Sequence, residues 1–135
     1  MAGFPCTASE SAMSAPVRLP VKVWVEGVGD YEAELIKFFA PATVTELARL
    51  LPIEGMAGLW DYAVYVETRV ARGAEKPTDN VEPGDIVFWP PAGAIGFVFK
   101  KAKPYAQTVK VGRLYGDPAA LAKTRAGARV RILKR

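Results

Sequence analysis

The chain has 135 residues, 50% of them hydrophobic, which suits one domain with its own core and is too short for two. It contains no histidine and one cysteine, which excludes a Ser-His-Asp triad, a histidine-ligated metal, an internal disulfide and a cysteine zinc cluster. The net charge of +4 is unevenly spread: residues 1–90 carry seven Lys and Arg against thirteen Asp and Glu (−6), and residues 91–135 carry eleven against one (+10).

The first part of the chain is rich in small and polar residues and has neither a basic start nor a continuous apolar run. This composition predicts a disordered leader at residues 1–19, followed by one folded domain at 20–135. With no secretory signal and no membrane span, we expect a cytoplasmic protein. One Asn and one Gln beside eleven prolines are typical of a heat-adapted protein.

The domain opens with a predicted β-hairpin. Residues 21–28 alternate between apolar and polar side chains, Gly29 and Asp30 have turn chemistry, and residues 31–38 form the return strand. Next, Thr43 and Glu46 have the spacing of a capping box, which predicts a short helix that Pro52 ends. The glycine-punctuated stretch at 52–60 is expected to be irregular or strand-like.

Three further strands are predicted in the rest of the acidic part and just after it. They lie at residues 63–66, 85–89 and 94–99, and a long polar loop occupies 71–84. The strand at 94–99 is apolar throughout, so we expect it to be buried on both faces.

The basic C-terminal third adds two strands and a helix. Residues 108–115 and 128–133 alternate, and Asp117 with Pro118 provides an N-cap and a first-turn proline for a short helix. These basic strands either lie beside acidic ones and are neutralised or attract nucleic acid. Seven or eight short strands with two short helices indicate a mainly-β barrel or sandwich.

One run of residues is more specific than this pattern. Residues 83–91 read Pro-Gly-Asp-Ile-Val-Phe-Trp-Pro-Pro, and Gly93 and the apolar strand 94–99 follow. This run resembles the central signature of a small prokaryotic cyclophilin-like family of unknown function, and the resemblance extends over about residues 20–134. It implies a closed eight-stranded antiparallel barrel capped by helices. It does not imply prolyl isomerase activity, because the Phe-His-Arg setting of cyclophilins is absent and Arg69 matches no motif.

The candidate site is a set of aromatic and charged side chains in the middle of the chain. A tryptophan at a strand end before two prolines is well placed to line a pocket, and a Tyr and a Glu two residues apart share a strand face. The alternatives are that the aromatics fill the core and that the charges form surface ion pairs. The candidate ligand-binding residues are Trp60, Tyr65, Glu67, Trp89, Phe97 and Arg113.

Three functions follow from these observations. The first is a binding module that holds a peptide or small molecule in this aromatic pocket. The second is peptidyl-prolyl isomerisation, with Arg69 or Arg113 as the donor to the prolyl nitrogen. The third is nucleic-acid binding through the basic third, with Phe97, Phe99 and Tyr105 for stacking. No phosphate loop or EF-hand is present, so no cofactor or metal is expected. A carboxylate pair for glycoside hydrolysis stays open, since the distance between acids depends on the tertiary structure.

Overall fold

The computed structural model describes residues 18–68, 70, 77–90, 92–104 and 108–135. Most of the predicted leader, residues 1–17, lies outside the described residues. Its last two residues, Arg18 and Leu19, open the first strand, β1 (Arg18–Val25). Neither helix in the described part of the chain has the length and apolar character that a membrane span requires.

The predicted hairpin is present, but its turn comes earlier than expected. β1 pairs antiparallel with β2 (Gly29–Ile36), and Val25 lies opposite Gly29. The turn therefore occupies residues 26–28, where Gly27 has a φ of +82° and the Val28 amide donates to the Val25 carbonyl at 3.0 Å. The prediction that Gly29 and Asp30 form the turn is wrong, because Gly27 supplies the left-handed conformation first.

Helix α1 (Pro41–Leu50) also begins earlier than its predicted cap. Its N-cap is Ala40, which makes no side-chain hydrogen bond, and Pro41 occupies the first turn. The capping box at Thr43 and Glu46 is wrong: Pro41 has the φ that a first helical turn needs, so the helix starts there and Thr43 is buried within it. The predicted end before Pro52 is confirmed.

The stretch after Pro52 accounts for the difference between the predicted eight strands and the nine found in the described part of the chain. It forms two short strands, β3 (Ile53–Met56) and β4 (Gly58–Leu59), which separate at Ala57. Ala57 exchanges main-chain hydrogen bonds with Ala128 and Gly127, and this directs β3 to the last strand, while β4 pairs with the strand that follows it.

The remaining elements match the sequence predictions closely. They are β5 (Ala63–Glu67), β6 (Asp85–Trp89), β7 (Ala94–Val98), β8 (Val109–Tyr115), the 3-10 helix η2 (Pro118–Lys123) and β9 (Arg129–Lys134). Every residue of β7 is buried, which confirms the prediction for this strand. The predicted cap at Asp117 is also confirmed, because its carboxylate accepts the Ala119 amide at 3.0 Å.

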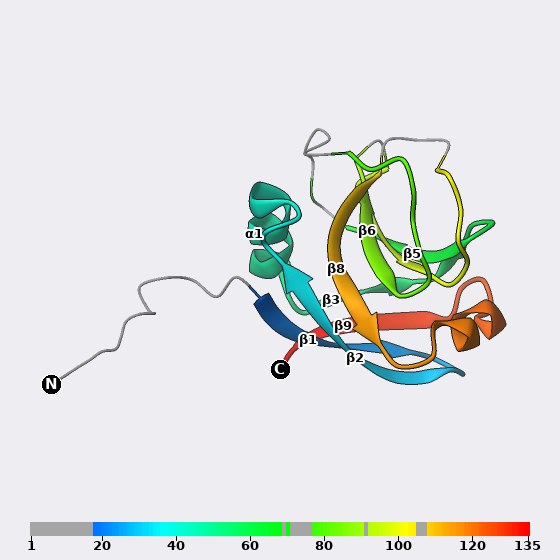
Figure 1. The fold of residues 1–135 in the computed structure, drawn as a ribbon. Helices are drawn as coiled ribbons and strands as arrows, with labels where there is room; N and C mark the ends of the chain where they lie inside the picture. Colours follow the sequence, from blue (N-terminus) through cyan, green and yellow to red (C-terminus); the bar gives the residue numbers. More distant parts are fainter. Residues whose placement is uncertain (1–17, 69, 71–76, 91, 105–107) are drawn as a thin grey trace, which may run out of the picture.

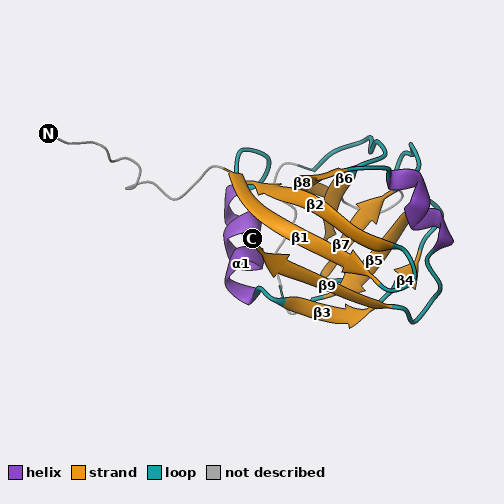
Figure 2. Ribbon diagram, turned by 90° about the horizontal axis from the view of Figure 1, so that it is seen from below, coloured by secondary structure: helices purple, strands orange, loops and turns teal. Residues whose placement is uncertain are grey.

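The nine strands of the described residues form one antiparallel sheet in the order β3-β9-β1-β2-β8-β6-β7-β5-β4. The sheet curls into a nearly closed barrel, with α1 at one end and η2 at the other (Figures 1 and 2). The predicted mainly-β cyclophilin-like barrel with two short helices is therefore confirmed, with a ninth strand. The barrel is not fully closed, because its two end strands, β3 and β4, pair with β9 and β5 and are not neighbours in the sheet.

Two apolar clusters form on the two faces of this sheet. The inner face holds the main core, which includes Phe88 and Phe97, both fully buried. A second cluster lies on the outer face of β5, β7 and β6. The segments around Val81 and Ala102 form a bridge with each other and pack against this cluster. This outer cluster comprises Tyr62, Ala63, Val81, Val87, Trp89, Ala94 and Val98. Two aromatic residues of the candidate site, Tyr62 and Trp89, belong to this outer cluster.

The basic strands lie beside acidic ones. Arg131 of β9 is 3.6 Å from Glu54 of β3, and Lys110 of β8 is 3.4 Å from Asp85 of β6. Arg135, directly after β9, pairs with Glu32 of β2. The neutralisation predicted from the charge asymmetry is confirmed for these strands.

Candidate functional site

Four aromatic side chains gather on the outer face of the barrel, and we call them the aromatic surface: Trp60, Tyr62, Tyr65 and Trp89. Trp89 is the centre, with its ring centroid 5.4 Å from that of Tyr65, 6.1 Å from Tyr62 and 6.2 Å from Trp60. Tyr62 and Tyr65 meet Trp89 edge-to-face, at 88° and 66°, which is an arrangement that aromatic pairs prefer, and Trp60 is tilted by 54° to it. The structure thus brings together Trp60, Tyr65 and Trp89 of the predicted site.

Two glycines determine how these rings lie on the sheet. A Cβ atom at Gly96 would lie 3.2 Å from Trp89 Cη2, and a Cβ atom at Gly58 would lie 2.7 Å from both Cε atoms of Tyr65. Trp89 therefore lies across β7, and Tyr65 lies across β4, in space that any other residue would fill. Aromatic residues and glycines thus alternate across the neighbouring strands β6, β7, β5 and β4. Each ring lies over the glycine of the next strand.

Exposure divides the aromatic surface into a floor and a rim. Trp89 is 8% exposed and Tyr62 is 3% exposed, whereas Trp60 is 47% exposed and Tyr65 is half-buried. Trp60 is placed by a tight turn, in which its amide donates to the Ala63 carbonyl at 2.8 Å. Trp60 and Tyr65 therefore provide the solvent-accessible part of the aromatic surface.

Tyr62 is the buried support beneath the rim. Burial raises the pKa of its hydroxyl above the usual 10.0, and hydrogen bonds from the side chains of Thr108 and Trp89 partly oppose this rise. The Trp89 indole N–H therefore faces Tyr62. Trp89 therefore contributes the surface of its ring to the site, because its indole N–H donates to Tyr62 and not to a ligand.

The other three predicted site residues are not part of the aromatic surface. Phe97 faces the barrel interior and is fully buried, so the prediction that it lines a pocket is wrong: inward and outward side chains alternate along β7, and the neighbouring Gly96 and Val98 are the outward ones. Arg113 lies opposite Glu34 and Asp85, at the far end of β6 from Trp89, and does not approach Glu67. Glu67 lies two residues beyond Tyr65 on β5 and borders the surface.

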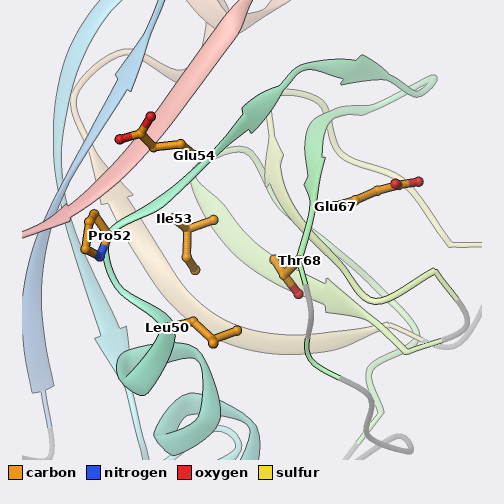
Figure 3. A pocket seen from close by; sticks show the side chains of 6 residues that line it. All are labelled: Leu50, Pro52, Ile53, Glu54, Glu67 and Thr68. Carbon is orange, nitrogen blue, oxygen red and sulfur yellow. The ribbon is translucent and has the colours of Figure 1, made fainter.

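A cleft of about 410 Å³ opens where the barrel fails to close, between β3 and the end of β5 (Figure 3). Its lining residues are Leu50, Pro52, Ile53, Glu54, Glu67 and Thr68. Figure 3 shows Ile53 and Thr68 facing the gap, with the carboxylates of Glu54 and Glu67 pointing away from each other. Glu54 instead lies 3.6 Å from Arg131 of β9.

Among the described residues, the aromatics considered for nucleic-acid stacking belong to the core rather than to an exposed basic face. Of the three aromatics considered for stacking, Phe97 is buried in the core, Phe99 is packed against it, and Tyr105 lies outside the described residues. Among the described residues, no three His, Cys, Asp or Glu side chains lie together as metal ligands.

Sequence reasoning missed three residues of the site: Tyr62, Gly58 and Gly96. A glycine inside a buried apolar strand often marks a close approach by another group, and this signal was available at Gly96. No comparable signal was available for Tyr62, because its role depends on contact with Trp89, 27 residues away along the chain.

Comparison with known proteins gives the same fold. No curated protein sequence matches the chain. The solution structure of the hypothetical protein AF2241 from Archaeoglobus fulgidus is similar with a TM-score of 0.74 and 27% sequence identity, over 90% of this chain and 98% of that one. A family model described as cyclophilin-like matches residues 19–133. The chain therefore belongs to the cyclophilin-like family.

Proposed function

We propose that the protein is a binding module, and that it holds a peptide or small molecule against the aromatic surface. The observation that carries this proposal is the half-exposed rim of Trp60 and Tyr65 on the fixed floor of Trp89. Most large aromatic side chains of a small domain fill its core. Here Gly58 and Gly96 leave space for the rings of Tyr65 and Trp89 to lie on the outer face of the sheet instead.

The chemistry of this surface favours a ligand that carries a ring. Tilted aromatic faces pack well against flat or puckered apolar rings, and proline-rich peptides use this mode because they reach the surface already extended. The rim is open rather than enclosed, so we expect a dissociation constant in the micromolar to millimolar range. A proline-containing peptide is the simplest ligand that fits these features.

Isomerase activity is not favoured. Arg113, one of the two arginines considered as a donor to the prolyl nitrogen, lies at the other end of β6 from Trp89. Arg69, the other, lies outside the described residues. The described part of the chain therefore offers no support for catalysis, and the proposal is limited to binding.

The experiment is a titration of isotope-labelled protein with short proline-containing peptides, followed through the indole N–H signals. Trp60 and Trp89 should shift progressively. Trp24 lies on β1, far from β5 in the sheet order, and its signal is an internal control that should stay fixed. Absence of any shift at Trp60 and Trp89 at millimolar peptide would refute the peptide form of the proposal.

A further inference from the structure

An acidic residue borders the aromatic surface on the side away from Trp60. Tyr65 and Glu67 are two residues apart on β5 and share its outer face, so their Cβ atoms are about 7 Å apart. In the ladder, Glu67 lies opposite Ala94, and Ala94 lies opposite Trp89. Only the small Ala94 therefore separates Glu67 from the floor of the surface.

Glu67 differs from the other glutamates of the described chain in having no partner there. Glu26 accepts the main-chain N–H of Arg129. The ion pairs of the others are Glu32 with Arg135, Glu34 with Arg18, Glu46 with Arg49, Glu54 with Arg131, and Glu82 with Lys101. Glu67 is exposed and has neither kind of contact to a described residue. No described residue therefore neutralises its negative charge, which lies beside the aromatic surface.

We propose, building on the function above, that the ligand is a cationic peptide in which a Lys or Arg stands two residues from a proline. The proline ring packs on Trp60 and Tyr65, and the cation reaches the Glu67 carboxylate along the face of the Tyr65 ring. An extended peptide repeats every two residues over about 7 Å, which equals the Tyr65–Glu67 spacing. A cation that lies between a carboxylate and an aromatic face is stabilised electrostatically by both groups.

The test compares three capped peptides that differ only in charge: Lys-Ala-Pro-Ala-Lys, Gln-Ala-Pro-Ala-Gln and Glu-Ala-Pro-Ala-Glu. The flanking residues are placed on both sides because the direction of the bound peptide is open. Affinities come from the Trp60 and Trp89 indole shifts at low salt. The proteins are the wild type, Glu67→Gln, and Glu46→Gln as a matched control with the same chemical change on α1.

We expect the lysine peptide to bind the wild type about fivefold more tightly than the glutamine peptide, and the glutamate peptide to bind most weakly. Glu67→Gln should remove this order, and Glu46→Gln should keep it. Equal affinity for the three peptides, or an order that survives Glu67→Gln, would overturn the inference and leave the aromatic binding site standing. Failure of all three peptides to shift the indole signals would instead overturn the proposed function.

Discussion

Replacing Gly58 with alanine tests the packing that creates the aromatic surface. Gly58 has no positive φ, so the backbone accepts alanine without strain. The new Cβ would lie 2.7 Å from both Cε atoms of Tyr65 and closer still to its Cζ, so the Tyr65 ring must move. The absence of a side chain at Gly58 therefore provides the space that the Tyr65 ring occupies.

The magnitude follows from two opposing effects. Displacing Tyr65 costs about 1–3 kcal/mol through overpacking and the lost ring pair with Trp89. Removing glycine from the unfolded chain stabilises the fold by about 0.4–1 kcal/mol. Gly58→Ala alone should thus lower the free energy of unfolding by about 1 kcal/mol. In a Tyr65→Ala background, only the stabilising effect remains, so Gly58→Ala should raise the free energy of unfolding.

The assay is urea unfolding of the wild type, both single variants and the double variant, followed by circular dichroism. The coupling between the two positions should be about 1–2 kcal/mol, well above the roughly 0.5 kcal/mol expected of independent sites. If Gly58→Ala has the same effect in both backgrounds, Tyr65 does not depend on the glycine and the reasoning fails.

Three further predictions concern binding, pH and the buried charge. Trp60→Ala should weaken peptide binding about tenfold and lower stability by only about 1 kcal/mol, since the side chain is 47% exposed; NMR titration and thermal unfolding measure the two effects. Because burial raises the pKa of Tyr62, its contribution to stability is complete below pH 10 and lost as the pH rises further, so Tyr62→Phe should flatten the alkaline fall in unfolding free energy. Asp85→Ala should cost about 1–3 kcal/mol in urea unfolding, because it removes the acceptor of the Glu82 amide and the partner of Lys110; a loss no greater than that of Glu82→Gln would contradict this.

The strands could be predicted because each carries its own signal. β6 was predicted with its bounds unchanged, since Asp85 and four apolar or aromatic residues stand between a Pro-Gly turn and a Pro-Pro exit. The stretch at 52–60 has no such signal, because β3 and β4 take their conformation from strands β9 and β5. The count of nine strands therefore depends on pairings that local pattern does not contain.

The site was only partly predictable for the same reason. Trp89 was found from the two prolines after it, and Tyr65 and Glu67 from their spacing on one strand. Phe97 was misassigned because alternation does not say which face of a doubly buried strand points inward. Arg113 was joined to the site without knowledge of the strand order, which places β8 three strands from β5.

The most direct test of the central claim is to observe a bound proline in contact with the aromatic rim. Intermolecular NOEs between a proline-containing peptide and the labelled protein should connect the pyrrolidine protons with the rings of Trp60 and Tyr65. Contacts confined to the opposite wall of the barrel, around Trp24 on β1, would contradict the proposed binding site.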